Sequence, residues 1–418
     1  HDEYQTAHNG LRHLFLRQRW QGIEVWNGDI AVHVDGSGEL VKLNNGAWSR
    51  LAKRVNATVP VVSAEAALTT VLRKNGIDET PVHSGYDAEA MEHTFIGDAF
   101  SGEPVKVKLV LQPVREKLML AWNVSHYTAD GTHWWNVRID ALTGEELDRN
   151  DWVVSCGVGH DHGEEDAPMP AAPNDYNVLP WPVESPNHGS RALRNAPWTD
   201  GGIASPYGWH DTNGAAGPEY TITRGNNVRA CEDADNNNTP GYSPTSATLD
   251  FDYALDLSQA PSAYQDAAIT NLFYWNNIIH DVWYQYGFDE ASGNFQSNNY
   301  GRGGLGNDFV NADAQDGSGT DNANFGTPPD GSSPRMQMYR WTYTTPNRDS
   351  DLDNGIIAHE YGHGISNRLV GGPANTSCLG NAEQMGEGWS DYFGLIMTIE
   401  ADNLGTDAKS VGTYVIDQ

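Results

Sequence analysis

Cysteine, basic residues and long apolar runs are all scarce in this sequence. Its three cysteines, Cys156, Cys231 and Cys378, cannot make a disulfide framework, and their odd number leaves one free thiol or a partner outside the chain. No run of about 18 apolar residues occurs, so no membrane span is predicted. Lysine and arginine number 25 against 56 aspartate and glutamate residues, and the net charge of −31 argues against nucleic acid or an anionic membrane as a partner.

A signal peptide is also missing from the start of the sequence. The chain opens on His1-Asp2-Glu3 without a basic and then apolar region, as a processed or trimmed product would. At 418 residues it is long enough for two or three domains, each with its own core. The acidic residues are spread widely without long blocks of one sign, a pattern that favours solubility.

The motif His359-Glu360-x-x-His363 lies within an apolar run. Residues four apart share one face of a helix, so His359 and His363 can direct their imidazoles at one point. Glu360 is rotated away from that line, and its carboxylate can reach a water without binding the metal. The spacing predicts a catalytic zinc site with Glu360 as the general base. The alternative is a chance match on a helix with solvated histidines.

A catalytic zinc needs a third protein ligand and one open position. Glu387 follows His363 by 24 residues, which is enough for the chain to return a second helix, expected at about Ala382 to Ala401. Asp391 shares a helix face with Glu387. We therefore expect Glu387 to be the third ligand and Asp391 to accept the second N–H of a ligating histidine.

The amino-acid sequence of this region resembles that of a known family. Gly355–Leu369, then Gly371-Gly372-Pro373 and Gly386–Asp391, are similar to the fungalysin family of secreted zinc peptidases, which are relatives of thermolysin. The resemblance implies an α+β fold with a thermolysin-like catalytic domain, a loop-rich β region and long active-site helices. It also implies secretion to the extracellular space and protein or peptide substrates.

The first part of the chain reads as β structure. Apolar alternation over residues 11–44 predicts strands, with turns at Asn27-Gly28 and Asp35–Gly38. Ser63 is predicted to cap a helix that ends before Gly76. No cluster of ligands or nucleophiles occurs in the first 150 residues.

This part resembles the fungalysin/thermolysin propeptide followed by a PepSY-type module, on the motifs Gln21–Val25, Trp134–Val137 and Thr143–Glu145. We therefore expect a β-rich pro-region over residues 1–154 that assists folding and blocks the cleft. The alternative is a permanent N-terminal binding domain. Residues 155–175 are polar and proline-rich, which is typical of a cleavable linker, and the catalytic domain would follow over 176–418.

Within the expected catalytic domain, helical spacing predicts a long helix over Ser262–Tyr286, and alternation predicts a strand over Arg335–Trp341. His280, inside that helix, is expected to be a packing residue. Asn322 and Ala323 lie in a segment similar to the one that, in thermolysin-like enzymes, pairs with the substrate backbone along a sheet edge. Peptide would then bind by strand addition.

Calcium is a second metal whose binding the sequence could indicate. Asp233-Ala-Asp235-Asn-Asn237 has the alternating oxygens of a calcium loop, but it lacks the glycine and the glutamate of an EF-hand, so a solvated turn is favoured over weak calcium binding. Asp349, Asp351 and Asp353 imitate EF-hand spacing with Glu360. They are expected to cap the following helix instead.

These features together predict a secreted zinc-dependent endopeptidase zymogen that hydrolyses peptide bonds with zinc-activated water and Glu360 as base. In the family, a mostly helical C-terminal lobe forms the other wall of the cleft, and this lobe is expected to be missing after Gln418. The alternative is therefore a catalytically incompetent fragment that acts as a binding or inhibitory module.

Overall fold

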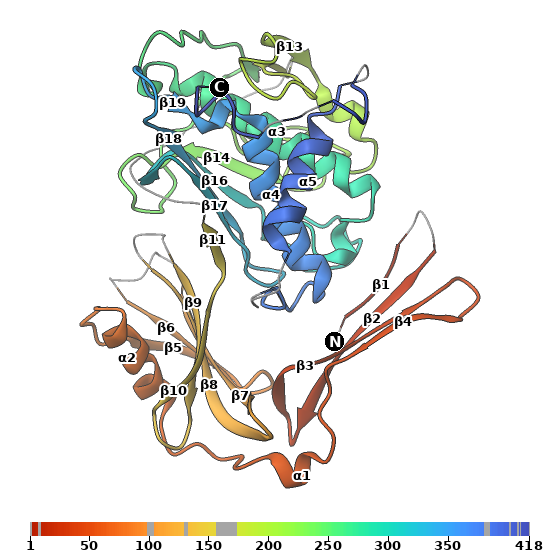
Figure 1. Cartoon of the computed structure of the whole chain (residues 1–418), viewed down its shortest axis with the longest axis vertical. Helices are drawn as coiled ribbons and strands as arrows, with labels where there is room; N and C mark the ends of the chain where they lie inside the picture. Colours follow the sequence, from red (N-terminus) through yellow and green to blue (C-terminus); the bar gives the residue numbers. More distant parts are fainter. Residues whose placement is uncertain are drawn as a thin grey trace. The chain divides into compact units, whose positions relative to one another are not determined.

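The computed structural model describes residues 2–6, 10–97, 104–128, 133–155, 174–379, 385–400, 403–407, 409 and 411–417 (Figure 1). The chain divides into two compact units, His1–Trp152 and Val153–Gln418, called here the first and the second unit. Among the described residues, no helix is both long and apolar enough to cross a bilayer. Both units mix helices with sheets, so the α+β prediction is confirmed.

The first unit is built on one twisted, mainly antiparallel sheet. Its described strands follow the order β1-β2-β3-β7-β8-β9-β10, with β4 beside β3 and β5 paired to β6, which pairs with β7. The elements are β1 Asp2–Gln5, β2 Arg12–Trp20, β3 Ile23–Val34, β4 Leu40–Asn45, α1 Leu51–Arg54, α2 Ala64–Lys74, β5 Val82–Asp87, β6 Glu92–Ile96, β7 Val105–Val114, β8 Lys117–Tyr127, β9 Trp134–Asp140 and β10 Glu146–Asp151.

Two local predictions in this unit have different outcomes. Ser63 caps α2, because its hydroxyl accepts the backbone N–H of Ala66 at 3.2 Å. The turn predicted at Asn27-Gly28 is wrong, since β3 runs straight through it. Asn27 has a φ of 52°, and the register of β2 against β3 shifts nearby, between Arg17 and Arg19. Asparagine tolerates this left-handed conformation, so the strand bends there without reversing.

The second unit contains a mixed sheet in the order β11-β17-β18-β16-β14, with β19 beside β18, and a small sheet β13-β12-β15. Strands β14, β16 and β18 are parallel, whereas β17 and β11 run antiparallel to their neighbours. The strands are β11 Val153–Ser155, β12 Asp175–Val178, β13 Ala192–Asn195, β14 Val228–Glu232, β15 Asp250–Phe251, β16 Val310–Thr320, β17 Ala323–Gly326, β18 Arg335–Trp341 and β19 Arg348–Asp349.

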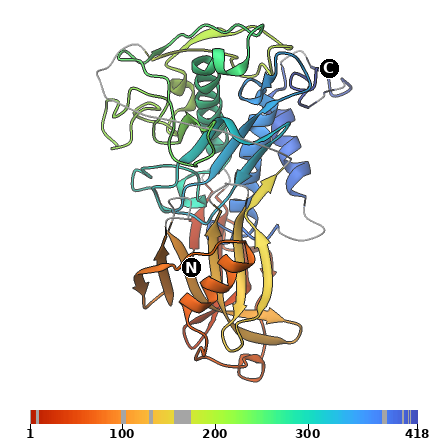
Figure 2. The ribbon, with the colours of Figure 1, turned by 90° about the vertical axis from the view of Figure 1, so that its left-hand side faces the viewer.

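In the described part of the unit, three α-helices accompany this sheet: α3 Gln265–Gln285, α4 Asn354–Val370 and α5 Gly386–Met397. Short 3₁₀ turns occur at η1 Pro197–Gly201, η2 Pro261–Ala263, η3 Glu290–Ser292 and η4 Ser350–Leu352. Helices α4 and α5 lie side by side (Figure 1), and both are blue in Figure 2. One face of the sheet is apolar and packs into a single core with α3 and α4, through residues such as Phe325, Met336 and Met338.

The helix and strand predictions for this unit are confirmed in type, with shifted ends. The long helix starts at Gln265 because Pro261–Ala263 forms a 3₁₀ turn. His280 is fully buried inside it, as expected for a packing residue. The second active-site helix ends at Met397, short of the predicted Ala401, because the Thr398 N–H bonds the carbonyl of Leu395 and closes the last turn. The predicted start at Ala382 lies outside the described residues.

Candidate metal centre and peptide-binding strand

Helix α4 carries His359 and His363 one turn apart on one face. Their Nε2 atoms lie 3.2 Å from each other. The helix is capped by Asp353, whose carboxylate accepts the N–H of Ile356 at 3.4 Å, as predicted. The same prediction is wrong for Asp349, which caps the 3₁₀ turn η4, and for Asp351, which accepts the N–H of Gln315. Glycine at 362 and 364 lets other aromatic residues press against the helix. A Cβ at Gly362 would lie 2.6 Å from Phe393.

Helix α5 brings Glu387 to the same point. Its Oε2 lies 3.1 Å from Nε2 of His359 and 3.4 Å from Nε2 of His363. Hydrogen bonds from His359, then from His363, hold the pKa of Glu387 well below its usual range. The three atoms therefore form one compact triangle of two imidazole nitrogens and one carboxylate oxygen.

This triangle fits a tetrahedral zinc ion. In tetrahedral geometry, ligand atoms at bonds of about 2.0–2.1 Å lie roughly 3.3 Å from one another. The separations of 3.1, 3.2 and 3.4 Å match that value. Two histidines and a glutamate are also a donor set that zinc accepts in catalytic sites, with one position left open.

Asp391 lies one turn after Glu387 on α5, behind His359. Its Oδ1 is 3.0 Å from Nδ1 of His359 and accepts the proton there. With a proton held on Nδ1, Nε2 is the nitrogen left to bind a metal ion, and it is the atom that faces Glu387 and His363. The structure thus places Asp391 where the sequence analysis expected a partner for a ligating histidine.

Glu360 lies beside the triangle and is 1% exposed. Its Oε2 has no hydrogen-bond partner among the described residues. Burial raises the pKa of this carboxyl, and Glu387 adds to the rise, while His359 and His363 oppose it. A buried carboxylate oxygen without a partner is costly unless another group, such as water or a ligand, reaches it.

Close contact of two glycines sets α5 against α4. A Cβ added at Gly394 would lie 2.9 Å from the carbonyl oxygen of Gly355. Only glycine permits this approach without displacing backbone. Because Glu387 and Asp391 lie on the same helix, the approach also sets how far they reach toward α4.

Strand β17 contains Ala323, and Asn322 directly precedes it. Nδ2 of Asn322 is buried and has no hydrogen-bond partner in the described part of the chain. On its outer side β17 pairs with β11, in the register Val153 with Gly326 and Ser155 with Asn324. This pairing was not predicted. The two valines before the proline-rich segment are β-branched, which was the one local hint of a strand.

A second group of acids lies away from the triangle. Asp233 of the predicted calcium loop is joined by Asp313 and Asp316 from β16, with carboxylate oxygens within 4.8 Å of one another. Arg335 forms an ion pair with Asp313. Burial raises the pKa of Asp233 to about 8, and Asp313 and Asp316 add to the rise. The calcium-loop pattern in the sequence contains Asp233 but not Asp313 and Asp316, because these two residues are far away along the chain.

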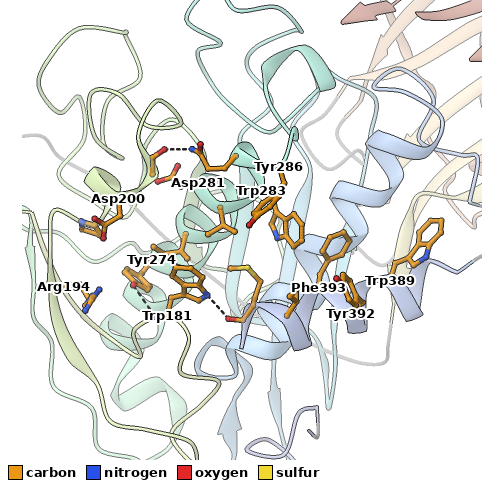
Figure 3. Close-up of a pocket in the computed structure, with 17 residues that line it drawn as sticks. Trp181, Arg194, Asp200, Tyr274, Asp281, Trp283, Tyr286, Trp389, Tyr392 and Phe393 are labelled. Carbon is orange, nitrogen blue, oxygen red and sulfur yellow. Dashed lines mark hydrogen bonds between the residues drawn. The ribbon is translucent and has the colours of Figure 1, made fainter. Parts of the chain in front are cut away.

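An aromatic cavity of about 640 Å³ opens on the other side of α5 (Figure 3). Trp389, Tyr392 and Phe393 of α5 line it together with Trp283 and Tyr286 near the end of α3. Trp389 and Phe393 alternate along α5 with Glu387 and Asp391, which contact His359. The helix thus presents its acids to the metal centre and its aromatic side chains to the cavity.

Comparison with known proteins gives two family matches. The Fungalysin metallopeptidase (M36) model matches residues 175–418, and the Fungalysin/Thermolysin Propeptide Motif matches residues 1–47. A solved structure, the Bacillus megaterium YpeB C-terminal domain, is 9% identical and covers 36% of this chain and 55% of its own, but its TM-score of 0.20 is too low to support an argument.

Several curated fungal proteins are similar over nearly the whole chain. "Extracellular metalloproteinase 2" of Trichophyton tonsurans is 37% identical over 99% of this chain and 63% of its own length. The protein of the same name from Arthroderma gypseum is 36% identical over 100% of this chain and 64% of its own length. "Extracellular metalloproteinase 3" of Trichophyton equinum is 36% identical over 99% of this chain and 63% of its own length. The chain thus spans a little under two thirds of the length of these relatives.

Proposed function

This chain belongs to the fungalysin family of metallopeptidases, and on that premise we propose that it acts in a secreted zinc endopeptidase made as a zymogen. The observation that carries the proposal is the triangle of His359, His363 and Glu387, with the partnerless oxygen of Glu360 beside it. Secretion is proposed from the relatives, whose names describe extracellular enzymes.

Zinc would be held by Nε2 of His359, Nε2 of His363 and Oε2 of Glu387. When bound, it supplies a Lewis acid that polarises the scissile carbonyl and lowers the pKa of water. Asp391 keeps the proton of His359 on Nδ1, so that Nε2 stays available as a ligand.

Glu360 would act as the base. Its buried Oε2 takes a proton from the attacking water and then delivers it to the nitrogen of the leaving amine. Burial favours this exchange because it raises the pKa of the carboxyl toward that of the groups with which it trades the proton. The carboxylate returns to its first state at the end of the cycle.

Peptide substrates would pair with the outer side of β17. Asn322 offers an amide N–H of Nδ2 that no described residue uses, and Ala323 offers backbone groups on the same strand. A peptide added to this edge would gain main-chain hydrogen bonds whatever its sequence, which suits an enzyme that cuts proteins.

Latency would follow from β11. This strand pairs with β17 on the side that a substrate would use, and it directly follows the first unit along the chain. We therefore assign residues 1–154 as a pro-region, 155–175 as a cleavable linker and 176–418 as the peptidase domain, with β11 reaching Ser155. The linker between 156 and 173 lies outside the described residues, and the PepSY-type module stays a prediction.

Calcium at Asp233 also stays a prediction. The Asp233 carboxylate accepts the N–H groups of Asn237 and Asn238 at 3.2 and 3.1 Å, which closes the loop without an ion. Arg335 supplies one positive charge to the neighbouring acids. A thermal shift on adding calcium, absent in Asp233→Asn, would support a bound ion.

The test of the main proposal uses the full-length secreted protein with a denatured protein substrate. We expect one zinc per chain by elemental analysis, proteolysis that a chelator stops, and recovery when zinc is restored. Glu360→Gln should keep the zinc and lose activity by about 10²–10⁴-fold, since it removes the base and leaves the ligands. A protein that binds zinc but never cuts would favour the binding-module alternative.

A further inference from the structure

The face of the second unit's sheet that points away from α3 and α4 is polar, yet buried. Asn322, Asn324, Gln337, Tyr339 and Asp316 are each no more than 3% exposed. Their neighbours in sequence, such as Phe325 and Met338, belong to the apolar core on the opposite face. Alternation along the strands therefore places a polar layer behind the edge to which a peptide would be added.

Within this layer, hydrogen bonds link β17 to a buried acid. Nδ2 of Asn324 donates to the hydroxyl of Tyr339, which lies 3.0 Å from Oγ of Ser318. Ser318 in turn donates to Oδ1 of Asp316 at 2.6 Å. Nε2 of Gln337 donates to Asp316 at 2.9 Å and to Ser318 at 3.0 Å, which fixes the Asp316 end of this series of hydrogen bonds.

The direction of this chain follows from counting protons. Ser318 has one hydroxyl proton, and its shortest acceptor is the Asp316 carboxylate, so the Tyr339 hydroxyl is left to donate to Ser318. Because the Tyr339 hydroxyl gives its proton to Ser318, its oxygen is the acceptor for the amide N–H of Asn324. Burial, followed by the charge of Asp316, raises the pKa of Tyr339, and Glu360 adds to the rise, so the hydroxyl keeps its proton.

This arrangement fixes the amide of Asn324 but uses only part of it. The amide has two N–H groups and one carbonyl oxygen, and Tyr339 takes one N–H. Asn324 is also the position of β17 that pairs with Ser155 in the β11 register. A substrate residue at that register position would lie directly beside the Asn324 side chain.

We propose that Tyr339 is a positioning residue for Asn324, and that Asn324 makes the enzyme prefer peptides with a polar, uncharged side chain at the residue paired with it. This inference rests on the proposed peptidase function and on pairing of the substrate with β17. An aliphatic side chain at that position would cover the polar layer without returning a hydrogen bond. Leaving a buried polar group unpaired in this way lowers affinity.

The test compares the full-length active enzyme with Asn324→Leu and Tyr339→Phe, on a peptide mixture whose cleavage products are read by mass spectrometry. For the wild-type enzyme we expect serine, threonine, asparagine or glutamine to be favoured about tenfold over leucine at one fixed distance from the cut bond, the ratio that about 1.4 kcal/mol gives. Asn324→Leu should reduce that ratio to about one or reverse it.

Tyr339→Phe distinguishes a role of Tyr339 in positioning Asn324 from a role in the stability of the fold alone. With a favoured peptide we expect KM to rise several-fold and kcat to change by less than about twofold, while a leucine peptide is cut as before. Tyr343→Phe, which removes an exposed hydroxyl from the loop after β18, is the matched control and should change neither value. Zinc content and thermal unfolding are measured for each variant to show that it is folded.

Peptide binding to the zinc-loaded Glu360→Gln protein gives a second readout without turnover. The same tenfold preference should appear in binding, and Asn324→Leu on that background should remove it. A protein that binds with this preference but never cuts would refute the peptidase function and would support the side-chain preference that Asn324 sets in peptide binding. An active enzyme whose preference is unchanged by Asn324→Leu, or that shows no preference at any fixed position, would refute the inference and keep the peptidase function.

Discussion

Oδ1 of Asp391 lies 3.0 Å from Nδ1 of His359, on the side of the imidazole ring opposite the metal triangle. The two residues come from different helices, 32 positions apart. Their contact ties the orientation of His359, a proposed metal ligand, to the packing of α5 on α4. A side chain that never touches the ion can therefore decide how well the ion is held.

Replacing that carboxylate should weaken the metal site. We expect Asp391→Asn to lower zinc affinity by about 10–100-fold, because the amide no longer stabilises the proton on Nδ1 of His359 as strongly. Competition with a chromogenic chelator measures the affinity. Glu116→Gln, an exposed change in the first unit, is the control and should leave it unchanged. Equal zinc affinity in Asp391→Asn and wild type would mean that the contact has no role in binding.

The glycine contact between α4 and α5 gives a second prediction. In Gly394→Ala the new methyl group would meet the Gly355 carbonyl oxygen at 2.9 Å, so α5 must move outward. Overpacking of this kind costs about 1–3 kcal/mol of folding free energy. We expect zinc affinity to fall as well, because Glu387 moves with the helix. Gly388→Ala, where a Cβ would meet nothing within 4 Å, is the matched control on the same helix. A loss of stability with normal zinc binding would show that Glu387 reaches the ion independently of helix packing.

The cap of α4 should make stability depend on pH. Burial, followed by the charge of Glu184, raises the pKa of Asp353 to about 7 from a usual value of 3.8. Between these two values the unfolded chain loses its proton and the folded chain keeps it, so stability falls as pH rises from about 4 to about 7.

Asp353→Asn should remove this pH effect while still capping the helix. We expect the variant to match wild type near pH 4 and to exceed it near pH 8 by on the order of 1–4 kcal/mol. Thermal unfolding at the two pH values measures the difference. If Asp353→Asn is the less stable protein near pH 8, the ionised carboxylate of Asp353 stabilises the fold there and does not destabilise it.

Latency should depend on the backbone of β11. Val154→Pro removes the N–H at the middle position of the strand, opposite Phe325, and should weaken pairing with β17. The uncut protein should then cleave a small peptide several-fold faster than wild type. Val154→Ala, which keeps the backbone N–H, is the control. Equal latency in the uncut Val154→Pro protein would show that β11 does not block the substrate strand.

The side chains of the proposed metal centre could be predicted from the sequence because helix geometry places them. His359, Glu360 and His363 lie on one helix, where spacing alone decides which side chains meet. Glu387 and Asp391 lie one turn apart on a second helix, so the prediction of that helix also predicted that both side chains share one face. The structure brings His359, His363, Glu387 and Asp391 into contact.

Most features that could not be predicted from the sequence depend on contacts between segments far apart in the chain. The pairing of β11 with β17 joins residues about 170 positions apart, and nothing in either strand specifies the other. Asp313 and Asp316 join Asp233 only because β14 and β16 are parallel neighbours. Helix α5 ends at Met397 and not at the predicted Ala401, because a local hydrogen bond at Thr398, and not the apolar pattern, closes the helix.

Strand β11 directly follows the first unit along the chain, yet it pairs within the second. While the chain is whole, this pairing is intramolecular, at an effective concentration on the order of millimolar for a short tether. A cut anywhere between 156 and 173 leaves β11 on the fragment that carries the first unit. The same three residue pairs must then form between two separate molecules. Release of the active enzyme would therefore be governed by dilution after the cut, and a concentrated secretion would stay latent longer than a dilute one.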